Sequence, residues 1–295
     1  MSAKEIFESC AFTARQDSGE EVIVRLEPAG SYISIVSAIQ KLAALVIPDY
    51  VPAVHQIGTA STENGKKLDY SVTTFIDNAV TLESVWGDLT DDQQSHVAEQ
   101  VAFAIKKIHS INLLDEKARQ FINHVIPEAP TVPLGGPELG YFSNVSDLVR
   151  GLVASQDAFD QITITGPDDG GFEFKTQFDD ISPVSMSGND IFTLQEAIVL
   201  CHNDLEPRNI LVRADNITAH YKVVAIIDWE MAGFFPFVFE SFYKDLALGS
   251  TNLDFPWYRK FKDQTAEFTP KPLPKGQKSL LRALDMVLKA RERAS

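Results

Sequence analysis

Three side chains that could bind a metal ion and accept a proton lie within a short stretch of this sequence. Asp204 and Asn209 precede an apolar run at 210–212, and Asp228 follows a second apolar run at 225–227. If the two runs pair as a β-hairpin, Asn209 and Asp228 come close together in space. An amide oxygen and a carboxylate are ligands of the kind that Mg²⁺ prefers, and a second carboxylate could take the proton of an attacking hydroxyl.

Phosphoryl transfer is the chemistry that needs such a set, because its loose transition state is served mainly by positioning and by charge stabilisation. His202, Asp204 and Asn209 fit the spacing His-x-Asp-x-x-x-x-Asn, which is a kinase signature when a metal-binding aspartate follows. An isolated aspartate or asparagine in a loop is usually a turn former. Since this pattern joins four residues, we favour a catalytic loop over that alternative.

Composition limits the kinds of partner that we expect. The formal net charge of −15 argues against nucleic acid, because phosphate binding favours a basic surface. An acidic protein can attract a cationic small molecule, although solubility alone also explains the charge. Two cysteines, Cys10 and Cys201, indicate a reducing compartment. With no signal peptide and no apolar stretch of membrane-spanning length, we expect a cytoplasmic protein without a membrane partner. The sequence carries no signal for oligomeric state.

Strands come first along the chain, and helices dominate later. The early elements are strands at 10–15, 21–26 and 68–76, with an amphipathic helix at 32–46. The later elements are helices at 91–111, 145–160 and 277–294, with a loop at 127–140 and an exposed loop or insertion at 163–190. This order is typical of an α+β fold. We expect a small lobe with a sheet over residues 1–77 and a larger helical lobe over residues 78–295.

Two motifs in the chain closely resemble those of the aminoglycoside phosphotransferase/choline kinase family. Residues 202–212 read HNDLEPRNILV, and residues 226–230 read IIDWE. Members of the family carry His-Gly/Asn-Asp-Leu-x-x-x-Asn-Ile-Leu-Val and then Ile-Asp-Trp/Phe-Glu. Residues 232–236 are similar to those of its fungal-type members, and weaker likenesses extend over about residues 10–260.

The resemblance implies a protein-kinase-like, two-lobe fold that uses ATP as co-substrate and Mg²⁺ as cofactor. Such an enzyme moves the γ-phosphate to a hydroxyl of a small molecule. By position, Asp204 would be the catalytic base or would orient the hydroxyl, and Asn209 and Asp228 would hold Mg²⁺. His202 would be a structural hydrogen-bonding residue of the loop.

The resemblance also implies the nucleotide contacts. Arg25 would approach the α- and β-phosphates of ATP. Backbone groups near Phe75, Ile76 and Asp77 would meet the adenine ring.

Three departures from the family pattern keep an alternative open. The usual strand lysine is Arg25, which is not interchangeable with lysine. The helix expected to supply its glutamate partner has no acidic residue from Gly30 to Val46. The phosphate-covering loop is missing or shortened, so we expect a shortened N-terminal sheet lobe. The alternative is therefore a catalytically impaired pseudokinase that acts as a binding or scaffold protein.

Three further acidic residues have open roles. Glu206 could face the substrate or be solvated, and Glu230 could support the metal site indirectly or form a structural salt bridge. Glu240, together with nearby aromatic side chains, could hold a cationic head group of the acceptor. We expect at least half of those aromatic residues to be core instead. They are Phe234, Phe235, Phe237, Phe239, Phe242, Tyr243, Trp257 and Tyr258.

Overall fold

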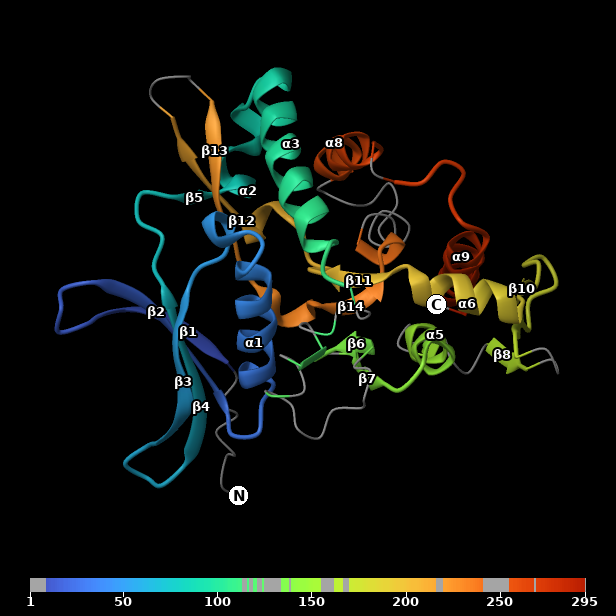
Figure 1. Cartoon of the computed structure of the whole chain (residues 1–295), viewed down its shortest axis with the longest axis horizontal. Helices are drawn as coiled ribbons and strands as arrows, with labels where there is room; N and C mark the ends of the chain where they lie inside the picture. The colour runs from blue at the N-terminus through green and yellow to red at the C-terminus, as the bar shows by residue number, and fades with distance from the viewer. Residues whose placement is uncertain are drawn as a thin grey trace.

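A four-stranded sheet forms one end of the computed structural model, and a larger, mainly helical part forms the other (Figure 1). The structure describes residues 9–112, 116, 119–120, 124, 134–137, 139–154, 162–166, 170–215, 220–240, 255–267 and 269–294. The expectation of a missing or shortened phosphate-covering loop concerns residues before Cys10, nearly all of which lie outside the described residues. Within the described part of the chain, no helix is both long and apolar enough to cross a membrane.

The four-stranded sheet is antiparallel throughout, with the strand order β1-β2-β4-β3. Its strands are β1 (Cys10–Arg15), β2 (Glu21–Pro28), β3 (Val54–Ser61) and β4 (Lys67–Thr74). Helix α1 (Ile33–Ala44) packs against it and buries Ile39, Leu42 and Ala43 (Figure 1). The predicted β1, β2, β4 and α1 are confirmed. The sequence prediction lacks β3, because this edge strand is mostly exposed and has little hydrophobic pattern.

The predicted hairpin is present and belongs to a second sheet. It consists of β12 (Ile210–Ala214) and β13 (Tyr221–Ile226), with β5 (Val80–Thr81) on the other side of β12. Its antiparallel register pairs Ile210 with Ile226. Since β4 belongs to the first sheet and β5 to the second, the residues between them form the connector between the two parts of the molecule.

The longest predicted helix in the middle of the chain is confirmed as α3 (Asp91–Ile108). Thr90 begins it with a capping box. The Thr90 hydroxyl accepts the backbone N–H of Gln93, and the Gln93 side chain accepts the backbone N–H of Thr90. Its apolar stripe is fully buried and packs against α8 (Phe255–Thr265) and β13. The residues of this stripe are Val97, Val101, Ile105 and Ile108.

The predicted loop at 127–140 is wrong where the structure describes it. A third sheet, of order β11-β14-β6-β7, consists of β11 (Ile198–Cys201), β14 (Gly233–Pro236), β6 (Leu134–Gly136) and β7 (Gly140–Phe142). Its glycines reflect close packing between strands: a Cβ at Gly233 would lie 2.1 Å from the carbonyl oxygen of Gly135. Close approach explains Gly136 and Gly233, whereas Gly140 has the φ of 92° that is typical of a turn glycine and open space around it. Residues 127–133 of the predicted loop lie outside the described residues.

The expectation of an exposed loop or insertion at 163–190 is wrong as to the exposed loop, where the structure describes these residues. This segment contains most of a fourth sheet and the start of a helix: β8 (Ile162–Thr165), β9 (Phe172–Thr176), β10 (Val184–Met186) and α6 (Gly188–Glu196). Phe172, Phe174 and Met186 are buried there. The alternation of Phe172 and Phe174 is a period-two strand signal, which the many polar and glycine residues around it obscure.

The remaining helices complete the larger part. They are α5 (Val145–Ala154), α9 (Lys275–Ala294), the short α2 (Leu82–Val85) and the 3-10 turns Trp86–Asp88, Pro207–Asn209 and Trp229–Met231. A further 3-10 turn, Pro48–Tyr50, lies between α1 and β3. The predicted helix near the end of the chain is confirmed as α9. The predicted helix at 145–160 is confirmed up to its residue 154, and residues 155–160 lie outside the described residues.

Gly276 sits where α9 meets α6 and leaves no room for a side chain. A Cβ there would lie 2.2 Å from the carbonyl oxygen of Asp190 and 2.5 Å from the hydroxyl of Thr193. Gly276→Ala should therefore lower the free energy of unfolding by about 1–3 kcal/mol, as overpacking usually does. Urea unfolding measures this loss. Gly87→Ala is the matched control, because nothing lies within 4 Å of a Cβ there, and equal stability of the two variants would contradict the prediction.

Candidate active site

Asp204 and Asn209 lie on the loop between β11 and β12 and are joined by hydrogen bonds. The side-chain Nδ2 of Asn209 donates to the Asp204 carboxylate over 2.7 Å and to the Asp204 backbone carbonyl over 2.9 Å. Both residues are buried, with exposed fractions of 5% and 4%. Because these two bonds use the amide nitrogen, they leave the amide oxygen of Asn209 as a possible metal ligand.

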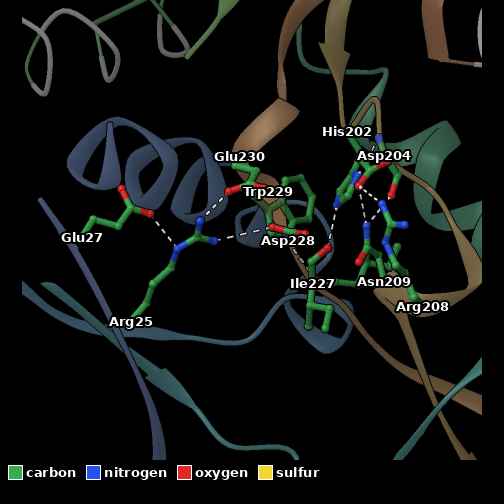
Figure 2. A network of polar contacts seen from close by, with 11 residues as sticks. Arg25, Glu27, His202, Asp204, Arg208, Asn209, Ile227, Asp228, Trp229 and Glu230 are labelled. Atoms are coloured by element: carbon green, nitrogen blue, oxygen red, sulfur yellow. Dashed lines mark hydrogen bonds and ion pairs between the residues drawn. The ribbon is translucent and has the colours of Figure 1, made fainter. Parts of the chain in front are cut away.

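The backbone of Ile227 joins this loop to Asp228. Its N–H donates to the Asn209 carbonyl over 2.9 Å, and its carbonyl oxygen lies 3.0 Å from Nε2 of His202. Asp228 is the next residue, so its carboxylate extends from a backbone that the loop holds in place (Figure 2). Asp204 also donates its backbone N–H to Nδ1 of His202 over 3.2 Å. The predicted hydrogen bonding of His202 within the loop is thus confirmed.

The carboxylate of Asp228 lies in a locally negative environment. Burial and the neighbouring charge of Glu230 raise the pKa of Asp228, and Arg25 only partly opposes them. Asp204 is near enough to raise it further. Asp228 has a φ of 64°, a left-handed conformation that is uncommon for a residue with a side chain. The oxygen donors and the surplus negative charge suit a hard divalent cation, so the residues present fit a Mg²⁺ site.

Arg25, which the family resemblance places near the phosphates, lies beside this site on β2. Its Nε donates to Glu27 over 2.6 Å, its Nη2 donates to Glu230, and its Nη1 lies 3.6 Å from an Asp228 carboxylate oxygen (Figure 2). Although burial alone would lower the pKa of Arg25, its contacts with Glu230, Glu27 and Asp228 raise it above the ordinary value. The guanidinium is therefore charged and lies among three carboxylates.

Arg208 is a site residue that the sequence reasoning missed. Its Nη1 lies 2.5 Å from a Glu206 carboxylate oxygen, and its Nη2 lies 3.5 Å from the Asp204 carboxylate. The signal was a basic residue inside an otherwise acidic loop, four positions after Asp204. Glu206, left open between a substrate contact and a solvated residue, thus forms an ion pair with Arg208.

The structure corrects the expectation that Glu240 holds a cationic head group. Its side chain is fully buried, with an exposed fraction of 0%. The carboxylate accepts the backbone N–H groups of His202 over 2.6 Å and of Asn203 over 2.8 Å, and it lies 3.7 Å from Nε2 of His109. Burial alone would raise the pKa of Glu240, but His109 and the His202 amide hold it below its usual range. Glu240 therefore supports the loop that begins at His202 from inside the protein, with its side chain shielded from solvent.

The aromatic residues around Glu240 are largely core, as expected. Half of the eight are buried, namely Phe234, Phe235, Trp257 and Tyr258. Phe242 and Tyr243 lie outside the described residues.

The expected adenine contacts lie on the connector between β4 and β5. A hollow of about 400 Å³ adjoins it, and Phe75 and Asp77 are among the lining residues. Ile76 is partly buried and is not part of that lining. Arg213 donates to the Asp77 carbonyl over 2.7 Å and lies 3.3 Å from its carboxylate, which fastens the connector to β12.

Comparison with known proteins assigns a family. The model of the phosphotransferase enzyme family, APH, matches residues 11–243, more than three quarters of the chain. A search of curated proteins finds no match. Comparison with known proteins does not support the pseudokinase alternative.

Similar solved structures include two phosphotransferases. Macrolide 2'-phosphotransferase MphH from Brachybacterium faecium has 17% sequence identity and a TM-score of 0.44, covering 99% of this chain and 86% of its own. A GDP complex of wild-type aminoglycoside 2'-phosphotransferase-IIIa has 11% identity and a TM-score of 0.45, covering 99% and 86%. With TM-scores below 0.5, neither likeness adds to what the family match shows. On the family match, the chain belongs to the phosphotransferase enzyme family and has its α+β, two-lobe, protein-kinase-like fold.

Proposed function

We propose that this protein transfers the γ-phosphate of ATP to a hydroxyl group of a small molecule, with Mg²⁺ as cofactor. The observation that carries the proposal is the clustering of Asp204, Asn209 and Asp228 around the backbone of Ile227. Asn209 and Asp228 would hold Mg²⁺, which when bound neutralises phosphate charge.

Asp204 is positioned to act on the acceptor. In the transfer, the acceptor oxygen forms a bond to the γ-phosphorus as the bond to the β-phosphate oxygen breaks, and ADP leaves. The hydroxyl proton passes to the Asp204 carboxylate, or the carboxylate orients the hydroxyl while its proton passes to an oxygen of the transferred phosphoryl group. The Asn209 amide holds this carboxylate in place at 2.7 Å, so its direction is set before the substrate binds.

Two arginines supply positive charge for the phosphates. Arg25, at the Asp228 side of the site, would contact the α- and β-phosphates. Arg208, whose side chain is 55% exposed, lies next to Asp204 and could meet the phosphoryl group during transfer. Arginine binds phosphate well because its planar guanidinium offers several donors in a fixed geometry.

For the acceptor we propose a small molecule, with cationic amino alcohols and aminoglycosides as the first class to test. The net charge of −15 and the carboxylates around Asp204 favour a positively charged ligand over an anion. The two thiols, Cys10 and Cys201, are free, which supports a reducing, cytoplasmic location.

Binding of Mg²⁺-ATP tests the proposal at its first step. Millimolar Mg²⁺-ATP should raise the melting temperature of the wild-type protein, because a ligand of the folded state stabilises it. The shift should be lost without Mg²⁺ and in Asp228→Ala, which lacks a proposed metal ligand. Differential scanning fluorimetry measures both. Asp285→Ala, which removes a partly exposed carboxylate of α9 that pairs with Lys289, is the control that should keep the shift.

An activity screen completes the test. ADP release with a panel of amino alcohols, sugars and aminoglycosides should identify acceptors of the wild-type protein. ATP binding without transfer to any acceptor, in the panel or in a metabolite extract, would instead favour the pseudokinase. No ATP binding at all would overturn the proposed function.

A further inference from the structure

Arg25 in the small lobe has no acidic partner on α1, the helix that would be expected to provide one. Arg25 lies on β2, and α1 packs against the same sheet. No acidic residue occurs from Gly30 to Val46, a stretch that includes all of α1. An arginine side chain has many rotamers, so a phosphate-binding arginine needs a partner to fix its direction.

Glu230 provides such a contact from the other side of the site. The Nη2 of Arg25 donates to the Glu230 carboxylate, across 205 positions of sequence. Glu27 binds the same guanidinium through Nε at 2.6 Å. Glu27 lies two residues along the same strand, so it cannot link β2 to another part of the chain, whereas Glu230 can.

The turn that carries Glu230 explains how it reaches β2. Trp229 is buried, with an exposed fraction of 2%, and its ring N–H donates to the Ile226 carbonyl over 3.0 Å. The indole thus anchors the short 3-10 turn in the core. Asp228 and Glu230, on either side of it, both extend toward Arg25 (Figure 2). The same turn therefore presents a proposed metal ligand and the partner of the proposed phosphate cation.

We infer that Glu230 is a positioning residue, which fixes the direction of Arg25 for the phosphates of ATP in place of a glutamate on α1. This role rests on the proposed function. The third donor group of Arg25 is consistent with this role. Its Nη1 lies 3.6 Å from an Asp228 carboxylate oxygen, which is too far for a good hydrogen bond. Nη1 is thus the donor that bound phosphate can take over, while Nε and Nη2 stay with the two glutamates.

The solvent exposure of Arg25 and Glu230 favours a positioning role over a structural one. Arg25 is 29% exposed and Glu230 is 44% exposed. Ion pairs this open to solvent contribute little to stability. Loss of the Glu230 charge should therefore leave the fold intact and should change mainly the direction of the guanidinium.

Binding measurements with two ligands test the inference. Glu230→Gln should weaken Mg²⁺-ATP binding by about five-fold or more, while adenosine, which lacks phosphates, should bind as it does to the wild type. Arg25→Ala should show the same selective loss. The double variant should bind Mg²⁺-ATP no more weakly than Arg25→Ala alone, because Glu230 acts through Arg25. Isothermal titration calorimetry on the full chain measures all four proteins.

A remote ion pair of the same chemistry is the control. Arg293 and Asp180 lie 2.7 Å apart, and both are more than half exposed. Arg293→Ala and Asp180→Asn should leave binding of both ligands unchanged.

Three results would overturn the inference. Equal weakening of adenosine and Mg²⁺-ATP by Glu230→Gln would indicate a structural role. Additive losses in the double variant, with a raised Mg²⁺ requirement in Glu230→Gln alone, would make Glu230 a metal-site residue that acts without Arg25. Unchanged binding in Glu230→Gln would remove the role while leaving the proposed function intact. Failure of the wild type to bind Mg²⁺-ATP would instead overturn the proposed function itself, together with this role.

Discussion

Asp204→Asn should lower the turnover number of phosphate transfer by about 10²–10⁴-fold, the usual contribution of a positioned acid–base group. Asparagine keeps the size of the side chain and can still accept the 2.7 Å hydrogen bond from Asn209. It cannot take a proton at neutral pH, and it removes the negative charge that attracts the acceptor hydroxyl. Binding of Mg²⁺-ATP should change little, because Asp204 is not one of the proposed metal ligands. ADP release with an acceptor from the panel measures the turnover number.

The control for this prediction is Asp263→Asn, which makes the same chemical change at an exposed position of α8. It should keep wild-type turnover. A combined result, with Mg²⁺-ATP affinity preserved and turnover lost only in Asp204→Asn, would tie Asp204 to the transfer step. Turnover by Asp204→Asn within a few-fold of wild type would show that another group accepts the proton.

The sequence was most informative where chemistry and local structure coincide. The spacing of Asp204 and Asn209, followed by an apolar run, predicts a loop entering a strand. The second apolar run predicts the partner strand that delivers Asp228. Because a hairpin pairs neighbouring segments, its geometry follows from the local pattern. The observed pairing of Ile210 with Ile226 confirms it.

The contacts that depend on distant segments were not predictable in the same way. Glu230 binds Arg25 from 205 positions away in the sequence, and no local sequence pattern predicts which carboxylate will pair with a given cation. Glu240 shows the same limit, because an acidic residue among aromatic ones suggested an open, cation-binding pocket. Its carboxylate is buried where it accepts hydrogen bonds from the backbone N–H groups of His202 and Asn203, and tertiary structure alone brings these groups together.

The strands that the sequence prediction missed have two physical causes. A strand at an edge, such as β3, has too few buried residues to show an alternating pattern. The strands β6 and β14 contain glycine because their backbones approach closely, as at Gly135 and Gly233. Glycine at such a position serves packing, yet its local signal is that of a turn.

The buried Glu240 carboxylate leads to the second large expected effect. Glu240→Ala should lower the free energy of unfolding by about 3 kcal/mol or more, because hydrogen bonds to a charged group contribute about 1.5–3 kcal/mol each. Two backbone N–H groups, those of His202 and Asn203, would lose their acceptor inside the protein. Activity should fall as well, since Asp204 follows these amides directly along the chain. Urea unfolding and ADP release measure the two effects.

The pH dependence of this stabilisation has a definite sign. The pKa of Glu240 is lowered in the folded protein, so the unfolded state binds its proton more readily than the folded state does. The stabilisation is thus fully present above the unfolded pKa, which is about 4.3 for glutamate. It is lost as the pH falls from there through the lower folded pKa. The difference in unfolding free energy between wild type and Glu240→Ala should therefore shrink below about pH 4.

An exposed glutamate gives the comparison that isolates this effect from general acid denaturation. Glu196→Ala, at the exposed end of α6, should be nearly neutral at every pH, because surface substitutions usually change stability by less than about 0.5 kcal/mol. If Glu240→Ala unfolded with the same free energy as Glu196→Ala at neutral pH, the carboxylate would not be what holds the catalytic loop. If the loss of unfolding free energy in Glu240→Ala stayed equally large below the folded pKa of Glu240, the packing of the side chain and not its charge would provide the stabilisation. Glu240 is a buried anion that accepts two hydrogen bonds. We therefore expect a loss of unfolding free energy in Glu240→Ala that is large at neutral pH and becomes smaller in acid.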